Sequence, residues 1–187
     1  MVDLAAAGFT SRSLADLRHS GARYREAIPV LVDWLVRVTD VKVKGEIVRA
    51  LSVPWAKPLA TGPLLEQFRQ LEASADPTGT GLRWTIGNAL EVLFVDADFD
   101  AFADLARDVR FGKARQMIVL ALGKSKRLDA VEVLLDLVDD PEVDGQAVKA
   151  LAKLKAPSAR SALEGKLADG RAWVRSAARK GLAKLPA

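Results

Sequence analysis

Apolar residues recur three and four positions apart along most of the chain, in short segments separated by turns. The segment 28–38 carries Ile28, Leu31, Val32, Leu35 and Val38 in this spacing. Such spacing places apolar side chains on one face of an α-helix. Similar segments follow to the C-terminus, divided by Pro, Gly or Asp-containing turns. The pattern therefore predicts an all-α chain built from helical hairpins.

The pattern predicts about five hairpins. Their helices are expected at 24–38 with 42–53, 62–72 with 81–95, 99–107 with 111–122, 128–138 with 143–154, and 157–168 with 171–185. A shorter helix ending at Arg18 precedes them, and Ser11 or Ser13 is expected to cap it. We therefore expect one domain over residues 1–187, with an N-terminal cap helix in residues 1–22 and repeats over 24–185.

The second helices of the hairpins align on a small residue followed by Leu. This pair occurs at Ala50-Leu51, Ala89-Leu90, Ala121-Leu122, Ala150-Leu151 and Gly181-Leu182. The positions four and eight before each Leu are also apolar: Ile47, Ile86, Ile118, Ala147 and Ala178, then Val43, Leu82, Ala114, Val143 and Val174. A helix of this kind cannot bury its stripe alone, so the recurrence predicts stacked repeats with a shared core, and the small residue lets neighbouring helices approach closely.

Polar residues also recur in register. The position after the first apolar column holds Lys44, Arg83, Arg115, Asp144 and Arg175, and Asp40, Asp139 and Asp169 stand in the preceding turns. With these features, residues 24–185 resemble the HEAT family of helical repeats, and most closely its short bacterial, PBS-lyase-type form. The resemblance implies a right-handed α-α superhelix, a HEAT-like solenoid with the second helices on its concave side. It also implies turn Asp to helix Arg contacts between repeats, a pattern from which Asp144 departs.

The register and the resemblance together predict the residues that are exposed on the concave face. They are Arg49, Trp84, Asn88, Met117, Leu120, Lys124, Lys149, Lys153, Lys180 and Lys184. Trp84, Asn88, Met117 and Leu120 are expected to form a mixed apolar and polar patch, which suits protein recognition. The lysines form either a basic groove or an ordinary solvated helix face. Burial is favoured for each of the four Trp, and Trp55, in a loop, is the best candidate for an exposed anchor.

The charge of the chain is unevenly distributed. Residues 1–109 hold 12 Lys or Arg and 15 Asp or Glu, whereas residues 110–187 hold 16 and 9. Attraction to an anionic partner should therefore originate in the C-terminal half. The chain has no Cys, which favours a reducing compartment. Its N-terminus lacks a signal-peptide pattern, and no run approaches the roughly 18 apolar residues of a membrane span. We expect a cytoplasmic protein without a membrane partner.

Residues that could carry catalysis are few. Without Cys and with His19 as the single His, nucleophilic triads and histidine metal sites are nearly excluded. The run Asp96-Ala97-Asp98-Phe99-Asp100 starts like a calcium loop, but Ala101 and Arg107 occupy the positions that need Gly and Glu. Helix capping is the expected role of these carboxylates. We expect no enzyme activity, no metal and no cofactor.

Three functions follow from these observations. The first is a non-catalytic protein-binding scaffold or adaptor that grips its partner on the concave face. The alternative is a nucleic-acid-binding module that uses the C-terminal Lys and Arg stripe, with strongly salt-dependent binding. The third is a HEAT-like DNA glycosylase, although none of the four Trp is followed by the Asp of that family's Trp-Asp arrangement.

Overall fold

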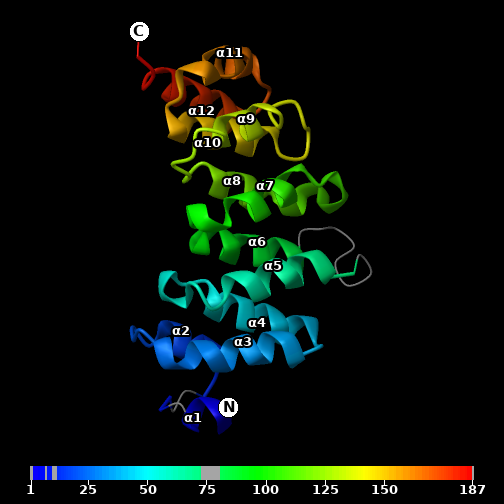
Figure 1. Ribbon diagram of the computed structural model, residues 1–187, viewed down its shortest axis with the longest axis vertical. Helices are drawn as coiled ribbons and strands as arrows, with labels where there is room; N and C mark the ends of the chain where they lie inside the picture. Colours follow the sequence, from blue (N-terminus) through cyan, green and yellow to red (C-terminus); the bar gives the residue numbers. More distant parts are fainter. Residues whose placement is uncertain (1, 7, 10–11, 73–80, 187) are drawn as a thin grey trace. The chain divides into compact units, whose positions relative to one another are not determined.

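A computed structural model of the protein describes residues 2–6, 8–9, 12–72 and 81–186. These residues form helices, 3-10 turns and connecting loops and contain no strand, so the predicted all-α helical-repeat fold is confirmed (Figure 1). The chain divides into two compact units, Met1–Leu93 (unit 1) and Phe94–Ala187 (unit 2). The single domain over residues 1–187, with its cap at 1–22 and repeats at 24–185, stays a prediction.

The described residues of unit 1 form two hairpins preceded by short helices. The elements are α1 (Val2–Ala6), α2 (Leu14–His19), η1 (Arg25–Ala27), α3 (Ile28–Arg37), α4 (Val41–Leu51), η2 (Pro54–Ala56), α5 (Thr61–Gln70) and α6 (Leu82–Leu93). Ser13 caps α2 by accepting a hydrogen bond from the Asp16 N–H at 3.0 Å, as predicted. Ser11 lies outside the described residues. Asp40 caps α4 by accepting from the Val43 N–H at 2.9 Å.

The core of unit 1 follows the predicted columns with one exception. Ile47, Leu51, Ile86 and Leu90 are fully buried, but Val43 is 48% exposed. Leu82 holds the same position on α6 and is only 6% exposed, so the helical spacing alone does not expose Val43. Val43 lies in the first turn of α4, where it lines a groove with Val41 instead of packing in the core, and it was wrongly assigned to the column.

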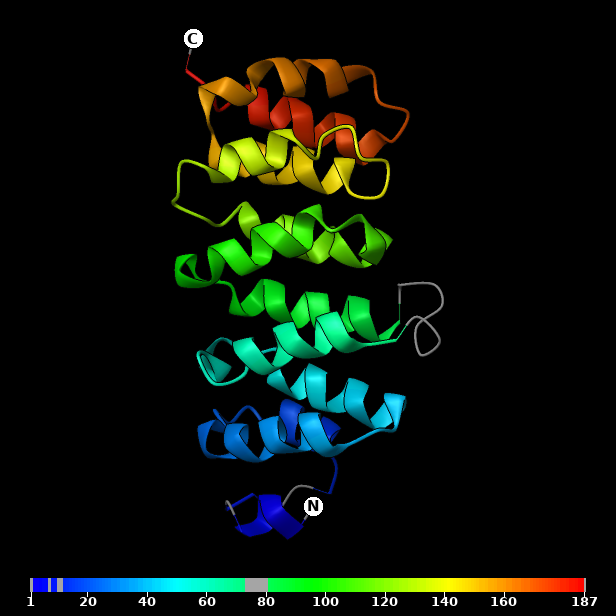
Figure 2. The ribbon, with the colours of Figure 1, turned by 45° about the vertical axis from the view of Figure 1, so that its right-hand side comes forward.

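Unit 2 contains three hairpins, α7 with α8, α9 with α10 and α11 with α12. Its elements are η4 (Asp96–Asp98), α7 (Phe99–Arg107), η5 (Val109–Arg115), α8 (Gln116–Leu122), α9 (Ala130–Leu135), α10 (Asp144–Leu154), η6 (Pro157–Ala159), α11 (Arg160–Gly165), η7 (Lys166–Ala168) and α12 (Ala172–Leu182). Figure 2 shows these helices, from green to red, stacked within the unit. The expected helix at 111–122 begins with a 3-10 segment, because Gly112 has a φ of 46° and interrupts the α-helix.

Close approach of the second helices in unit 2 explains the small residues of the repeat. Ala121 and Ala150 are at most 1% exposed, and Gly181 is buried. A Cβ placed on Gly181 would lie 2.8 Å from the Cβ of Ala152, and one on Gly123 would lie 2.8 Å from the Cα of Ala150. Real Cβ atoms essentially never come this near. The predicted close packing of α8, α10 and α12 is therefore present, with Gly123 as an additional contact that the repeat pattern had not indicated.

Candidate partner-binding surface

The ten residues predicted to bind a partner lie on the second helices or within two residues after them. Arg49 is on α4, Trp84 and Asn88 on α6, Met117 and Leu120 on α8, Lys149 and Lys153 on α10, and Lys180 on α12, while Lys124 and Lys184 directly follow α8 and α12. Each is exposed or half-buried. The patch of Trp84, Asn88, Met117 and Leu120 takes two residues from each unit and remains a prediction, as does the concave face.

Four of the predicted lysines line one groove between α10 and α12. The groove has a volume of about 500 Å³, and we call it the lysine groove. Its lining residues are Lys149, Ala152, Lys153, Lys155, Trp173, Ser176, Ala177, Lys180 and Lys184. No Asp or Glu lines it. Met117, Leu120 and Lys124 lie outside its lining.

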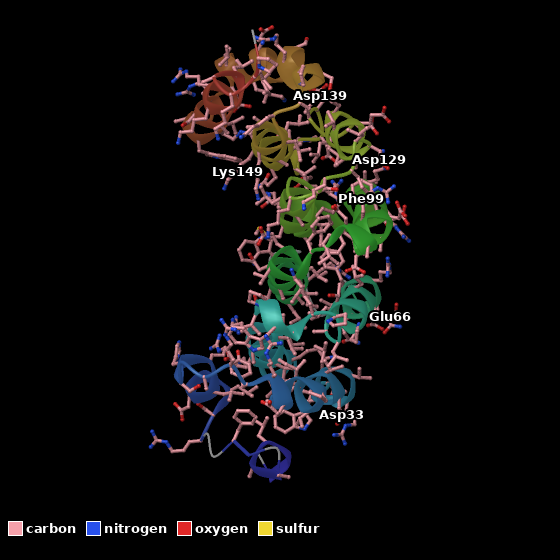
Figure 3. All side chains as sticks on the ribbon, turned by 60° about the vertical axis from the view of Figure 1, so that its left-hand side comes forward. Asp33, Glu66, Phe99, Asp129, Asp139 and Lys149 are labelled. Atoms are coloured by element: carbon pink, nitrogen blue, oxygen red, sulfur yellow. The ribbon has the colours of Figure 1, made fainter. Side chains whose placement is uncertain are left out.

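The five lysines of this groove differ from most arginines of unit 2, which have acidic or carbonyl partners. Within the described part of the chain, none of the five side chains takes part in a hydrogen bond or an ion pair. By contrast, Arg107 pairs with Asp136, Arg110 with Asp108, Arg115 with Asp140, Arg127 with Asp129, and Arg171 with Asp144. In Figure 3, Lys149 projects on the opposite side of unit 2 from Asp129 and Asp139. The acidic residues of the unit are thus used elsewhere, and the groove keeps uncompensated positive charge.

Trp173 supplies the aromatic wall of the lysine groove. Its side chain is 46% exposed, so the expectation of burial was wrong for this residue. A Cβ on Gly145 would lie 2.3 Å from the Cη2 of Trp173, which shows how closely the indole packs on α10. The guanidinium of Arg171 lies 5.7 Å from the centroid of the indole ring. Gly145 and Arg171 together hold the indole in place while part of it remains open to solvent.

Trp55, the best candidate among the four Trp for an exposed anchor, packs against the fold of unit 1 instead. Its ring packs edge-to-face on Tyr24 with centroids 5.6 Å apart, and its Nε1 is buried. The Tyr24 hydroxyl donates a hydrogen bond to the Ala50 carbonyl at 3.0 Å. Burial raises the pKa of Tyr24, and the nearby Arg18 only partly offsets this. Trp55 is therefore half-buried, in line with the burial favoured for each Trp and not with an exposed anchor, because the loop after α4 folds back over Tyr24.

The turns beside the lysine groove are held by a cluster of charged residues. Arg171 donates to the Asp144 Oδ1 at 2.9 Å and Oδ2 at 2.5 Å, and to the Asp169 Oδ2 at 2.8 Å. The Nζ of Lys166 lies 3.5 Å from Asp144. Asp144, which departs from the Arg of the other repeats, thus keeps the contact between repeats with reversed polarity. The carboxylate is on the helix and the guanidinium is in the following turn.

Both carboxylates of this cluster have lowered pKa values. Burial raises the pKa of Asp144, but hydrogen bonds from Arg171 and from the Gly145 N–H outweigh burial and leave this pKa below the ordinary range. Hydrogen bonds from the side chain and the backbone of Arg171 hold the pKa of Asp169 far below the ordinary range. A carboxylate whose pKa is lower in the folded state stabilises the fold above its unfolded pKa, and it loses this contribution as the pH falls toward the folded pKa.

We therefore expect unit 2 to lose stability as the pH falls below about 4, the unfolded pKa of Asp. The Asp144→Asn variant should be less stable than wild type at neutral pH and should lose less stability between about pH 4 and pH 2. Urea unfolding followed by circular dichroism across this interval measures both. Asp139→Asn is the matched control, since the Asp139 side chain is 93% exposed. If wild type and Asp144→Asn lost the same stability over this interval, Asp144 would not be a source of the pH dependence.

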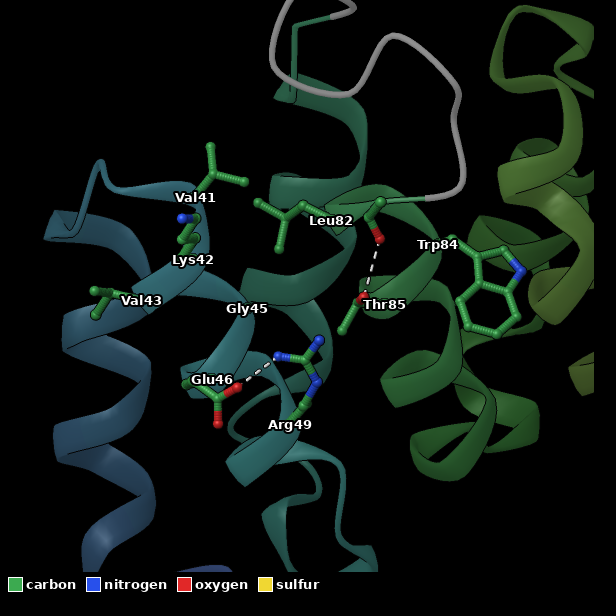
Figure 4. Close-up of a pocket in the computed structure, with 10 residues that line it drawn as sticks. Val41, Lys42, Val43, Gly45, Glu46, Arg49, Leu82, Trp84 and Thr85 are labelled. Atoms are coloured by element: carbon green, nitrogen blue, oxygen red, sulfur yellow. Dashed lines mark hydrogen bonds and ion pairs between the residues drawn. The ribbon is translucent and has the colours of Figure 1, made fainter. Parts of the chain in front are cut away.

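A second groove lies within unit 1, between α4 and α6. It has a volume of about 640 Å³, and its lining includes Val41, Val43, Arg49, Leu82 and Trp84. In Figure 4, Val41 on α4 faces Leu82 on α6 across the groove. Val41 and Val43 are 40% and 48% exposed. Of the predicted residues, Arg49 and Trp84 are brought together here, and Arg49 already pairs with Glu46 at 2.7 Å. Its lining includes charges of both signs, Lys42, Glu46 and Arg49, so this groove carries less net charge than the lysine groove.

The acidic run that begins at Asp96 fixes a loop. Asp96 accepts a hydrogen bond from the Ser125 hydroxyl at 2.6 Å and another from the Lys126 N–H at 3.2 Å. Asp98 precedes α7, but its carboxylate does not cap the helix. The capping prediction for this run was therefore wrong, because its carboxylates bind the loop after α8 and Arg127 instead. Among the described residues, no group of three His, Cys, Asp or Glu is placed to hold a metal ion.

Sequence reasoning missed Lys155, Trp173 and the small residues of the lysine groove. A signal for Trp173 was present, since Trp173, Ala177, Lys180 and Lys184 follow each other at spacings of four, three and four. Residues so spaced share one face of a helix. Lys155 lies beyond α10 in a left-handed conformation with a φ of 58°, which the helical register does not predict.

Comparison with known proteins identifies the type of repeat in unit 2. Residues 99–183, from the start of α7 to just beyond α12, match the family model for HEAT repeats. No curated protein and no solved structure matched the chain. None of the helices in the described residues has the length and apolar character needed to cross a membrane.

Proposed function

We propose that the protein is a non-catalytic scaffold or adaptor built from HEAT repeats, because residues 99–183 match the family model for these repeats. HEAT repeats generally serve as protein-interaction scaffolds. In the proposal, a protein partner is held by the exposed side of the second helices, which carry the ten predicted residues. A cytoplasmic setting, expected from the Cys-free composition, is part of the proposal.

The lysine groove is the observation that carries this proposal. It joins an exposed indole to five unpaired ammonium groups on neighbouring repeats. Partly exposed aromatic side chains that are already held in place are effective anchors for a partner, because little conformational freedom is lost on binding. No His, Asp or Glu lines the groove, so its side chains include no carboxylate or imidazole base. These features support binding rather than catalysis.

Affinity capture from a lysate of the native host tests the proposal. We expect nuclease-treated lysate to yield a protein that wild type retains. The variant carrying Lys149→Glu, Lys153→Glu, Lys180→Glu and Trp84→Ala should retain at least about tenfold less of it, as loss of an anchor and of charge complementarity implies. Quantitative mass spectrometry of the retained proteins is the measurement.

Two controls define what would contradict this function. The Lys113→Glu, Lys126→Glu variant reverses two exposed lysines of unit 2 outside the lysine groove and should capture the partner normally. Equal capture by the fourfold variant and wild type would show that these residues do not bind the partner. If nuclease removes all retained protein, the chain acts instead as a nucleic-acid-binding module.

Nucleic-acid binding is the second candidate, and the unpaired lysines are what favours it. Binding to phosphates through lysines would be insensitive to sequence and would weaken steeply with salt. Single-strand binding proteins also stack successive bases on several aromatic side chains. The lysine groove offers one, Trp173. We therefore rank this function below protein binding.

A further inference from the structure

We propose that the lysine groove binds an acidic protein segment that carries one apolar residue. The apolar residue packs on Trp173, and the Asp or Glu residues beside it face the lysines. This inference rests on the proposed scaffold function and names the chemistry of the partner. The argument uses the order of the groove's residues, their charge, and the small side chains between them.

The groove has an aromatic end and a basic end. Gly145 contacts Trp173 and Ala152 contacts Gly181, so α10 and α12 run in the same direction along the groove. Trp173 lies at the start of α12, and Lys180 and Lys184 lie at its end and just after it. With a rise of 1.5 Å per residue, the Cα atoms of Trp173 and Lys184 are about 16 Å apart. An extended peptide spans this distance with about five residues.

The basic end concentrates like charges that nothing in unit 2 is seen to neutralise. Lys149 with Lys153 and Lys180 with Lys184 are each four residues apart, a spacing at which like charges repel. Residues 145–187 contain ten Lys or Arg and only two Asp or Glu. Of these two acids, Asp169 is bound to Arg171, and Glu164 lies on α11, outside the groove. Carboxylates of a bound segment would relieve this repulsion and supply the missing counter-charges.

The lining favours a protein segment over a nucleic acid. One indole at one end suits a single apolar anchor, whereas bases stack on aromatic residues interleaved with cations. Small side chains, those of Ala152, Ser176 and Ala177, lie among the lysines and leave room for a peptide backbone. Lysine acts as a point charge toward carboxylate and phosphate alike, so the lysines admit either group, and the single indole and the small side chains favour the protein segment.

Fluorescence anisotropy with the full chain tests the proposal. The probe is a labelled peptide of about six residues, a Phe followed by a run of Glu, which is long enough to span the groove. We expect binding at low salt that weakens as salt is added. Reversing Lys149, Lys153, Lys180 and Lys184 to Glu should raise Kd more than about tenfold, whereas the Lys113→Glu, Lys126→Glu control should leave it unchanged. The four Lys→Gln substitutions should give a smaller increase in the same direction and guard against misfolding of the reversed variant.

A second comparison tests the anchor. Trp173→Ala should weaken binding of the Phe-containing peptide by about tenfold but should have little effect on the same peptide with Ala in place of Phe. The proposal would be overturned if the peptide did not bind at low salt, or if the variant with four reversed lysines bound it as tightly as wild type. A single-stranded oligonucleotide could also bind more tightly than the peptide and lose this binding in the variant with four reversed lysines. That result would overturn the proposal, because it would assign the groove to nucleic acid.

Failure of this inference can be told apart from failure of the scaffold function. A protein partner captured equally by wild type and by the variant with four reversed lysines would overturn the acidic-segment proposal and leave the scaffold function standing. Absence of any captured protein would overturn the scaffold function itself. The peptide result is independent of the host lysate, so the two experiments fail separately.

Discussion

Replacing Arg115 with Met is expected to destabilise unit 2 by about 3–5 kcal/mol, the range for removing one partner of a buried ion pair. The Arg115 side chain is 1% exposed, and its Nη2 lies 2.7 Å from the Asp140 carboxylate. It also donates to the Ala106 carbonyl at 2.9 Å and to the Gly112 carbonyl at 3.1 Å. Met fills a similar volume but donates nothing, so Asp140, which is 17% exposed, and both carbonyls lose a partner in a largely buried site.

Urea unfolding followed by circular dichroism measures this loss. Arg110→Met is the control, because the Arg110 side chain is 81% exposed and its ion pair with Asp108 is on the surface. Solvent screens such a surface pair, so removing it should change the stability little. Equal effects of the two substitutions would mean that Arg115 does not act as a buried link between repeats.

The polar residues that follow the first apolar column show how far such contacts could be predicted from the sequence. The resemblance to HEAT repeats implied contacts between repeats at these positions, and Arg115 with Asp140 is one. The partner is nevertheless the second Asp of the turn, whereas Asp139 had been expected. Arg83 instead donates to the carbonyls of Phe68 and Leu71 at the end of α5. The period of the repeat places such a side chain on its helix. The partner of the side chain depends on the geometry of the neighbouring turn, about which the period carries no information.

The helices themselves were predictable because burial imposes a strict period on them. The expected helix at 99–107 coincides with α7. Errors occur where the period weakens, as at Val43 in the first turn of α4 and at Gly112 before α8. Both lie at helix starts, where backbone conformation and neighbouring loops compete with the core for the same residue.

The lysine groove was predicted in part for a similar reason. Lys149, Lys153, Lys180 and Lys184 follow from the register, because residues offset from the core stripe face outward. Trp173 was expected to be buried, as Trp usually is. The indole packs closely on Gly145 of α10, where a Cβ would lie 2.3 Å from its Cη2, and the side chain is still 46% exposed. That contact joins two repeats, and a pattern within one repeat cannot contain it.

The second large effect is expected for Gly123→Val, because repeats approach each other closely at this residue. We expect the free energy of unfolding to fall by about 3 kcal/mol, the upper end of the range for overpacking. A Cβ at this position would lie 2.8 Å from the Cα, 2.9 Å from the Cβ and 3.2 Å from the carbonyl oxygen of Ala150. Since two of these three are backbone atoms of α10, no side-chain rotation can make room. The second helices α8 and α10 must separate, which loosens the core that they share.

Gly165→Val is the matched control, because a Cβ there would meet nothing within 4 Å. Gly165 ends α11, and replacing a helical Gly by Val changes stability by only a few tenths of a kcal/mol, in the favourable direction. Thermal and urea unfolding of the two variants should therefore differ by about 3 kcal/mol. If both retained wild-type stability, α8 and α10 would not be packed as closely as Gly123 and Ala150 indicate, and the repeats would be joined mainly by ion pairs such as Arg115 with Asp140.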